Sequence, residues 1–572
     1  MHFPIILLSL LGFYSFAEKI SYFIFNNKNN LVLNIFSFSL IFFIIYLINT
    51  YLFLLNIDSK FFSIAFSAAS LFLGGFFLRH NYSKILNFIH ENFNKKTILI
   101  SIISFFFIAN LVPSDEDSIR YHLEIPQKII DGTFYINHWF DYLGIGANEF
   151  VNLFGLQLNF TNTSSYLNFV YLFFIVLSNN YFFKEKKIGS DWVGNTIVLS
   201  SPYIIALVAS QKMYLLPCYI CAYTIAYIHI FKNKISYKES LLIISLNIFA
   251  TVSKVTLFPF LIIAIIYILL TTDFGLKNKI YLLIFSGAIF VVAQLPILII
   301  KYQIYQDPFL PIISINELNF EWWDVYSTQV LTASNMDFTD QLSKFYQIIS
   351  IPVKLIIPLQ PSDLFRTLGI GMFFVYFLDY KNNKHLLLLV VLFLLSIIIL
   401  NNYQSRWFLP LLLFIGIFTK EIKFKFINNL ARLQMVCSLI VTVPFAFLIT
   451  IPGELNMESK IFDQKKIIMT MNNKYKNEKY FSNFNSFFYL KNEVPVYIEQ
   501  KNILNTYDSK FFEKNSKVKL FLYQNRTGLF EDFSKKNLKC SDYQLIEIFH
   551  YNARRFFLIP TKAQLHLYRL FC

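Results

Sequence analysis

The stretch "LVLNIFSFSLIFFIIYLINTYLFLLN" (31–56) contains no charged side chain from end to end. A helix that crosses the hydrocarbon core of a bilayer needs about 20 mainly apolar residues. Residues 31–56 therefore predict a transmembrane helix.

Apolar runs of this kind recur from Met1 to about Ile451. Of the 572 residues, 56% are hydrophobic and 19% are aromatic, a composition that excludes an ordinary soluble protein. The first run has no basic residues before it and is interrupted by Glu18-Lys19, so we expect a retained span and not a cleaved signal peptide. We predict a mainly α, polytopic transmembrane helical bundle of about 11–14 spans. The candidate segments are 3–25, 31–56, 61–78, 97–113, 164–183, 191–209, 213–231, 239–252, 255–271, 280–300, 365–379, 385–400, 407–419 and 433–451.

Lys and Arg fall mainly in alternate loops, and short cytoplasmic loops are the ones enriched in these residues. We therefore place the basic loops in the cytoplasm and the other loops outside. The basic set contains Arg79, Lys84, Lys95, Lys96, Lys184, Lys186, Lys187, Lys232, Lys234, Lys238, Lys277, Lys279, Lys381, Lys384, Lys420, Lys423, Lys425 and Arg432.

Three regions follow from this pattern. Residues 1–96 form N-terminal transmembrane helices, 97–453 form a transmembrane region with outer loops 114–163 and 301–364, and 454–572 form a small extracytoplasmic α/β domain. Strand-like alternation in that domain occurs at 494–500, 518–524, 543–549 and 555–560. The domain is basic, which fits either contact with anionic headgroups or an acidic glycan, or an ordinary solvated surface.

The cysteines carry little functional signal. Cys218 and Cys221 form a C-x-x-C pattern inside an apolar run, where we expect two buried packing residues and no redox or metal site. Cys540 and Cys572 share the outer domain and could pair if that compartment is oxidising.

Charged residues gather at the outer boundary of the predicted spans. Charges beside spans are costly to desolvate and usually face a cavity, a partner or a substrate. A convergent outer site is therefore our hypothesis. Its members are Asp115, Glu116, Asp117, Lys212, Lys254, Asp307, Arg366 and Arg406.

Cations at this depth suit a lipid-linked phosphate. Arg406 begins "RWFLP" at the mouth of a span, where its guanidinium can grip two phosphate oxygens beside Trp407. Lys254 in "TVSKVTLFP" can act as a point charge on the same group. The alternatives are a snorkelling interfacial anchor for Arg406 and an ordinary turn residue for Lys254.

Carboxylates supply the base that a transfer at an anomeric carbon needs, because the acceptor hydroxyl must lose a proton. Asp115 and Asp117 lie two positions apart and could face one acceptor or one divalent cation. The alternative is that Asp117 or Ser118 caps the helix that follows. His122 could bind a metal, orient a carboxylate, or make only a structural hydrogen bond.

Four segments resemble sequence motifs of bacterial membrane glycosyltransferases of the GT-C superfamily, which use polyprenyl-phosphate sugars. These segments are "DSIRYHLEIPQKIIDG" (117–132), "KVTLFP" (254–259), "YQDPFLP" (305–311) and "SRWFLP" (405–410). One departure is "SQKMYLLP" (210–217), which has Tyr214 where we look for an acid in relatives.

The resemblance implies an inverting hexosyl- or pentosyltransferase of GT-C type in the plasma (inner) membrane of a bacterium. In this reading Asp117, or Asp115, is the base, and Arg406 with Lys254 or Lys212 faces the donor phosphate. Accessory candidates are Glu116, Tyr121, His122 and Asp307. No cofactor is predicted outright; if a divalent cation takes part, Asp115, Asp117 and His122 are the candidate ligands. Expected partners are the bilayer, a polyprenyl-phosphate-sugar donor and a glycan, lipid or protein acceptor, with no nucleic acid.

Two other functions stay open. A lipid-linked glycan polymerase or ligase would use a similar substrate on a different fold. A flippase or transporter of such glycans should line a central path with charges, whereas a transferase should gather them at one face.

Overall fold

The computed structural model describes most of the transmembrane region and parts of the C-terminal domain. The described residues are 3–25, 30–92, 95–110, 122–132, 134, 144–190, 192–309, 353–358, 367–381, 383–399, 405–421, 425–450, 470, 473–475, 480–482, 496–497, 520–524, 542–555 and 559–571.

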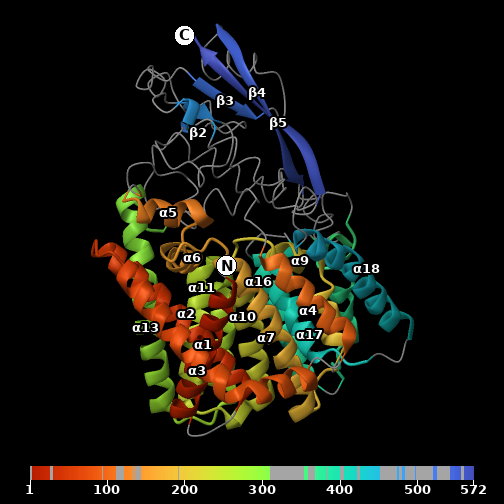
Figure 1. The fold of residues 1–572 in the computed structure, drawn as a ribbon. Coiled ribbons are helices and arrows are strands. Elements are labelled where there is room, and N and C mark those ends of the chain that lie inside the picture. Colours follow the sequence, from red (N-terminus) through yellow and green to blue (C-terminus); the bar gives the residue numbers. More distant parts are fainter. Residues whose placement is uncertain are drawn as a thin grey trace, which may run out of the picture.

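Most of these residues are helical, and the helices pack into a bundle (Figure 1). The α-helices are α1 (Phe3–Ile24), α2 (Leu31–Leu54), α3 (Lys60–Asn92), α4 (Lys96–Ala109), α5 (Glu124–Ile130), α6 (Ala147–Gln157), α7 (Thr163–Lys186), α8 (Val193–Leu199), α9 (Pro202–Val208), α10 (Leu215–Phe231), α11 (Tyr237–Ser253), α12 (Phe258–Thr271), α13 (Leu276–Tyr305), α16 (Lys384–Ile399), α17 (Leu409–Phe418) and α18 (Lys425–Thr450). Short 3-10 helices are η3 (Lys232–Lys234), η4 (Val255–Leu257), η6 (Ile370–Phe377) and η7 (Ser405–Phe408).

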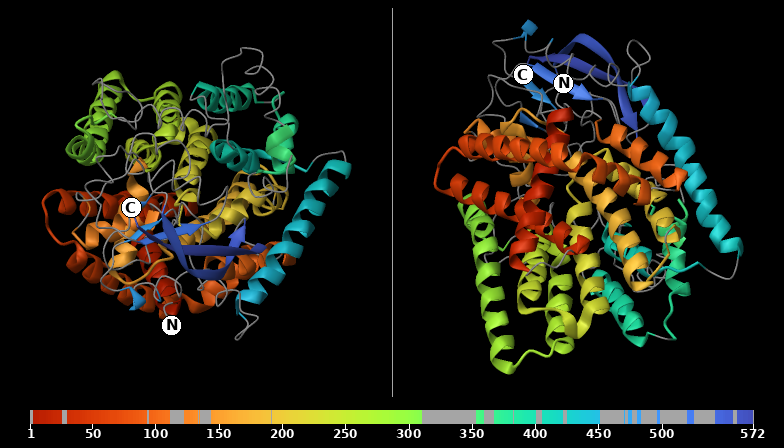
Figure 2. Two further views of the ribbon diagram at one scale, coloured as in Figure 1. Left: turned by 90° about the horizontal axis from the view of Figure 1, so that it is seen from above. Right: turned by 60° about the horizontal axis from the view of Figure 1, so that its bottom comes forward.

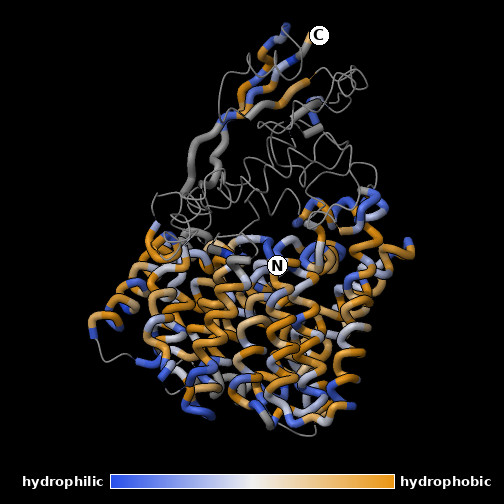
Figure 3. The backbone as a smooth tube through the Cα atoms, turned by 180° about the vertical axis from the view of Figure 1, so that it is seen from behind, coloured by the Kyte–Doolittle hydropathy of each residue, from blue (hydrophilic) through white to orange (hydrophobic). Residues whose placement is uncertain are grey.

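Five helices of the described part are long and apolar enough to cross a membrane, and five shorter apolar helices of 10–17 residues accompany them. The long ones are Leu31–Leu54, Lys60–Asn81, Thr163–Lys186, Leu276–Ile304 and Lys425–Pro444. Hydrophobic residues fill the length of the bundle, and hydrophilic residues lie at both ends (Figure 3). The predicted class of a helical membrane protein is thereby supported, while the number of spans stays a prediction.

Two predicted spans are wrong as single α-helices. The segment 191–209 is divided into α8 and α9, because Pro202 has no N–H for the bond that would continue α8 and instead begins the next helix. The segment 365–379 contains the 3-10 helix η6, which follows Gly369 at a φ of 81°.

Central and peripheral helices differ in burial. In α2 and α7, 72% of the most apolar window is buried, against 22% in α3 and 28% in α13. Seen from above, α18 also lies at the periphery (Figure 2). Polar side chains inside the bundle pair with each other, for example Ser39 with the Tyr171 hydroxyl at 2.7 Å and Ser178 with the Tyr219 hydroxyl at 2.8 Å. Such pairing is needed where no water is available.

One end of the bundle collects the predicted cytoplasmic loops. The Lys238 ammonium donates to the carbonyl of Ile24 at 3.1 Å, and Lys186 lies 4.8 Å from the ring centre of Phe231. We refer to this end as the basic end.

The loops that we predicted to lie outside the cytoplasm are at the opposite end of the bundle. The Asn162 amide donates to the carbonyl of Ala109 at 3.2 Å, and the Ser165 hydroxyl donates to the carbonyl of Ser210 at 2.9 Å. Helices α5 and α6 lie here, on the side that faces the C-terminal sheet (Figure 1). We refer to this end as the site end.

The C-terminal region contains a five-stranded mixed sheet in the order β2-β1-β3-β5-β4. Its strands are β1 (Tyr480–Ser482), β2 (Val496–Tyr497), β3 (Leu520–Gln524), β4 (Tyr543–Arg555) and β5 (Ile559–Leu570). Strands β1, β2 and β3 are parallel, and β5 pairs antiparallel with β3 and β4. Predicted segments 494–500, 518–524 and 543–549 overlap β2, β3 and β4, whereas 555–560 reaches only the last residue of β4 and the first two of β5, and β1 was missed. The helices expected in this domain stay a prediction, because most residues between the strands lie outside the described ranges.

Candidate functional site

The acidic triplet lies outside the described residues, as do Tyr121 and Arg366. The described residues that flank the triplet are Asn110, directly after α4, and His122, two residues before the start of α5. The Asn110 side chain accepts a hydrogen bond from Tyr166 near the start of α7, so this flank is fixed at the site end.

His122 forms a buried pair with Glu149. Its Nδ1 lies 2.7 Å from Glu149 Oε1, and both side chains are 1% exposed. The Asn148 amide contacts the same ring nitrogen. Because a carboxylate oxygen accepts, Nδ1 carries the proton and donates it to Glu149. The structural hydrogen bond weighed for His122 is therefore present, with a carboxylate as its partner.

Glu149 is held by the first turn of α6. The N–H of Gly146 donates to Oε2 at 2.7 Å, as expected for an acid at the third position of a helix. Gly146 also lies close to the end of α11, since a Cβ there would stand 2.6 Å from the carbonyl oxygen of Val252. The absence of a side chain at 146 lets α6 approach the turn that carries Lys254.

The pair prefers a neutral imidazole and an ionised carboxylate. Burial lowers the pKa of His122 to about 4, and the charges of Lys254 and Lys212 act in the same direction against the hydrogen bond with Glu149. Burial alone would raise the pKa of Glu149, but His122, Lys254 and the Gly146 N–H together hold it below its usual range.

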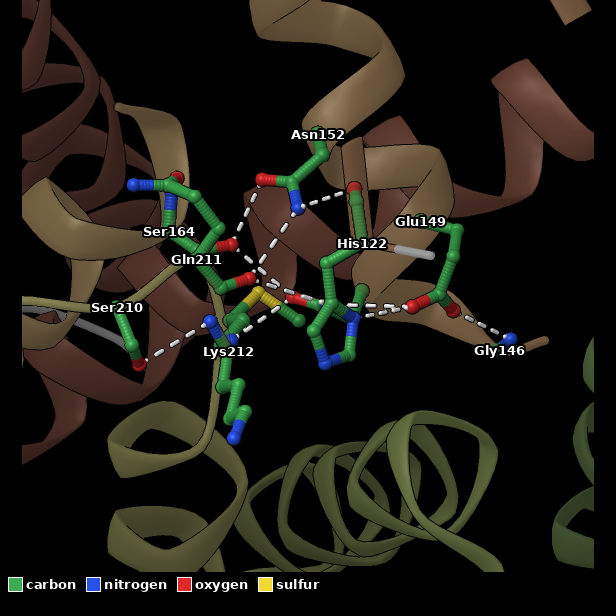
Figure 4. Close-up of polar contacts among 10 residues, drawn as sticks. His122, Gly146, Glu149, Asn152, Ser164, Ser210, Gln211 and Lys212 are labelled. Atoms are coloured by element: carbon green, nitrogen blue, oxygen red, sulfur yellow. Dashed lines mark hydrogen bonds and ion pairs between the residues drawn. The ribbon is translucent and has the colours of Figure 1, made fainter. Parts of the chain in front are cut away.

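Lys212 and Lys254 thus reach one site from separate inter-helix turns. Lys212 stands between α9 and α10, and Lys254 follows α11 in an extended conformation. Figure 4 shows the Lys212 side chain beside His122, on the side of the ring that faces away from Glu149. Both lysines were predicted from the sequence, and the structure brings them together with His122.

The Lys212 turn is fixed by buried amides of α6 and α7. Asn168 donates to the carbonyls of Leu207 and Lys212, each at 2.8 Å, and accepts from the N–H groups of Tyr214 at 3.2 Å and Leu215 at 3.1 Å. One side chain therefore satisfies four backbone groups of this turn.

A second set of contacts joins the same turn to α6 (Figure 4). Asn152 donates to the carbonyl of His122 at 3.0 Å and lies 3.4 Å from the carbonyl of Gln211. Ser164 Oγ lies 2.7 Å from Asn152 Oδ1, and the Gln211 amide donates to Ser165 at 2.6 Å. Buried polar networks in which each member is paired hold a single geometry.

Arg406 lies in η7, at the site end of the bundle. Its guanidinium carbon lies 5.0 Å from the ring centre of Trp407, and the Trp407 ring meets Tyr214 edge to face with 6.0 Å between centres. Tyr214 is the N-cap residue of α10 and follows Lys212 by two residues, so the Lys212 turn connects Arg406 to the His122–Glu149 pair.

Asp307 takes part in a local turn at the site end. It follows α13, is fully buried, and its Oδ1 accepts the N–H of Phe309 at 2.9 Å, which is a turn-forming contact. Glu124 and Lys128 form a further buried ion pair at 2.6 Å within α5.

In the described part of the chain, no three His, Cys, Asp or Glu side chains lie together as the ligands of a metal ion would. The proposed ligands Asp115 and Asp117 lie outside it. Cys218 and Cys221 are both buried and unbridged in α10, as expected for packing residues.

The sequence reasoning missed Glu149, Asn148 and Asn168. All three lie in or beside short polar segments that no motif singled out. The available signal was Glu149 three residues after Gly146, which is typical of an acid in the first turn of a helix.

Comparisons with protein-family models, with curated proteins and with solved structures each found no match to this chain. The function proposed below therefore depends on the residues of the site.

Proposed function

We propose that the protein is an integral membrane glycosyltransferase of GT-C type that moves a sugar from a polyprenyl-phosphate donor to a cell-envelope glycan, lipid or protein acceptor. The observation that supports this most is the gathering of Lys212, Lys254 and Arg406 at the site end. They come from three turns far apart in the sequence, and the acidic segment 111–121 is attached to the same end on both sides.

The charges suit a reaction in which a phosphate leaves. As the acceptor oxygen bonds to the anomeric carbon, the bond from that carbon to the phosphate oxygen breaks and negative charge develops on the phosphate. Preorganised cations at that position lower the barrier. The proton of the acceptor hydroxyl passes to a carboxylate, for which Asp117 is the proposed base.

The orientation follows from the basic end. If the basic end is cytoplasmic, the site end faces the outside, where nucleotide sugars are absent and a donor must come through the bilayer. A lipid-linked phosphate sugar meets that requirement.

The distribution of buried charge favours transfer over transport. Among the described residues, the buried ionisable acidic, lysine and histidine side chains lie at the two ends: His122, Glu124, Lys128, Glu149 and Asp307 at the site end, and His229 and Glu239 at the basic end. The middle of α10 carries Tyr219 and Tyr223 instead. A path for a charged glycan should place charges between the ends.

The test is donor profiling of the purified protein in lipid nanodiscs. Polyprenyl-phosphate sugars are supplied with an envelope extract as acceptor, and free polyprenyl phosphate is measured. We expect release by the wild type, none by Asp117→Asn, and unchanged release by Asp131→Asn, a matched control. Asp131 is exposed, caps α5, and accepts only the Gln127 amide at 2.9 Å among the contacts described for its side chain.

The outcomes separate two parts of the proposal. Full activity of Asp117→Asn refutes the assignment of the base. Absence of release from every polyprenyl-phosphate sugar, with a folded protein, refutes the transferase function. Arg406→Ala should raise KM for the donor before it lowers the rate at saturation.

A further inference from the structure

The β4–β5 hairpin continues beyond the rest of the C-terminal sheet. Strand β3 pairs with β5 only from Leu565 to Arg569. Strands β4 and β5 stay paired with each other as far as Arg555 and Ile559. In the described part, residues 550–555 and 559–564 therefore form a two-stranded extension, which points from the sheet toward the bundle (Figure 1). Two-stranded ribbons are only marginally stable by themselves, so side-chain contacts at the start of the extension decide how firmly it is held.

Four side chains form a line of contacts across the start of this extension. His566 Nδ1 lies 3.1 Å from the Tyr568 hydroxyl, and His566 Nε2 lies 3.1 Å from Gln564 Oε1. The nitrogen of the Gln564 amide lies 3.4 Å from Nδ1 of His550, which is its register partner on β4. Tyr568 is 8% exposed and belongs to the three-stranded part, whereas His550 and Gln564 are exposed and begin the extension. We name these four residues the histidine ladder.

The ladder is fully paired when both imidazoles are neutral. An amide oxygen only accepts, so His566 carries its proton on Nε2 and donates it to Gln564. Its Nδ1 then accepts from the Tyr568 hydroxyl. An amide nitrogen only donates, so Nδ1 of His550 accepts from Gln564.

One positive charge also fits the ladder, but two do not. A charged imidazole donates from both nitrogens. A charged His566 keeps the Gln564 oxygen as one acceptor and donates its other proton to the Tyr568 oxygen. A charged His550 is accommodated when the amide turns over, because the amide nitrogen can then donate to a neutral His566. When both rings are charged, two donors face an amide that has a single oxygen, so one contact to Gln564 is lost.

The described residues beside the ladder offer no carboxylate for a second charge. The titratable residues next to it are Tyr543 on β4, Lys562 on β5, and Tyr523, which is the β3 register partner of the central histidine. The acid of this part of β4 is Glu547, which the alternation of the strand places on the other face. Its Oε2 lies 2.8 Å from the Lys474 ammonium.

The electrostatics of His566 agree with this geometry. Partial burial lowers the pKa of His566, and the charge of His550 lowers this pKa further. A histidine whose pKa is lowered by folding stabilises the fold at higher pH, and this stabilisation is lost as the pH falls through the folded-state pKa. Acid should therefore weaken the sheet at the ladder.

We propose that the histidine ladder is a pH-sensitive switch at the junction between the three-stranded part of the sheet and the extension. With at most one charged ring, the ladder holds the extension in line with the sheet. With two charged rings, one contact to Gln564 breaks and the extension loosens. The proposal does not depend on the glycosyltransferase function, since every contact in it lies within the C-terminal sheet.

The test follows the extension in the full-length protein in nanodiscs. Hydrogen exchange of the backbone amides of 543–570 is measured by mass spectrometry from pH about 8 to about 5, the range in which imidazoles titrate, and is corrected for the intrinsic pH dependence of exchange. Loss of one hydrogen bond to a charged group should raise the corrected exchange of the extension about tenfold at the acidic end. The pKa of His566 is measured in the same protein from the rate at which diethyl pyrocarbonate modifies the neutral ring.

Three variants separate the switch from a general effect of acid. Gln564→Glu supplies two carboxylate oxygens, one for each ring, so the rise in exchange should disappear. His550→Leu removes the second charge, so the pKa of His566 should rise and the extension should stay protected in acid. Gln544→Glu is the matched control, because it adds the same charge to β4 on the other face, in register with Arg569. This control should behave as the wild type does.

Each outcome decides the proposal. A wild-type extension whose corrected exchange is independent of pH overturns it, and so does an equal rise in the wild type and Gln564→Glu. If Gln564→Glu does not fold, an unchanged pKa of His566 in His550→Leu overturns it. Loss of the rise in Gln544→Glu as well would assign the effect to added charge alone and would also overturn the switch.

Discussion

Replacing Gly146 with alanine should separate the two elements that bring Glu149 and Lys254 together. A Cβ at 146 would stand 2.6 Å from the carbonyl oxygen of Val252 and 3.3 Å from that of Ser253. The clash is with backbone, so no side chain can turn away to relieve it. The φ of Gly146 is −162°, which any residue adopts, so contact with α11 is the only obstacle.

The magnitude follows from the size of the clash. Ordinary contact begins at 3.4 Å, so α6 and the end of α11 must move apart by about 0.8 Å. Overpacking of this kind costs about 1–3 kcal/mol of unfolding free energy. Misplacement of a catalytic group by about 1 Å can lower a rate about a hundredfold. We therefore expect a modest loss of stability and a larger loss of activity in Gly146→Ala.

Gly144→Ala is the matched control. Gly144 lies two residues away in the same segment, and a Cβ there would meet nothing within 4 Å. Thermal unfolding in detergent and release of polyprenyl phosphate are measured for both variants. The reasoning is refuted if Gly146→Ala and Gly144→Ala have the same unfolding temperature and the same activity.

Three further predictions concern the same site. The free energy of unfolding should fall by about 3 kcal/mol as the pH drops from 6.5 to about 4, because the pKa of His122 is lowered from 6.5 to about 4 and each pKa unit corresponds to about 1.4 kcal/mol. Folding lowers both pKa values of the His122–Glu149 pair, so this stability is present at higher pH and lost on acidification. In His122→Gln the free energy of unfolding should depend less on pH. An unchanged pH dependence in that variant would contradict the assignment. Glu149→Gln keeps the shape of the side chain but removes the charge near Lys254, so activity should fall about tenfold or more while the protein remains folded, and a fully active Glu149→Gln would show that the charge has no role. Asn168→Leu should lower the free energy of unfolding by about 3 kcal/mol, because buried backbone groups of the Lys212 turn lose their hydrogen-bond partners. Unfolding curves of the variant and the wild type that coincide would contradict this prediction.

The helices were predictable because the bilayer imposes a simple rule on composition. Uncharged runs such as 31–56 became helices whose bounds agree with the prediction to within a few residues. The prediction for 191–209 was wrong because apolar composition was weighed above Pro202, which has the stronger local effect. Helices α3 and α18 extend beyond their predicted apolar runs, since a helix continues through polar residues once it is outside the hydrocarbon core.

The site was predictable only in part. Lys212 and Lys254 were found because each is a cation at the predicted outer boundary, where cations are scarce, and position alone made them informative. Glu149 was not found because its role comes from burial and from contacts with His122 and Gly146, which no local pattern reveals.

Membrane sidedness of the site residues tests the central claim most directly. Lys254→Cys, Arg406→Cys and Lys232→Cys are placed singly in a chain whose Cys437, Cys540 and Cys572 have been replaced, and intact cells are treated with a membrane-impermeant thiol reagent. The account predicts labelling at 254 and 406 from outside, and labelling at 232 only after permeabilisation. Labelling of 254 and 406 from opposite sides of the membrane would contradict it.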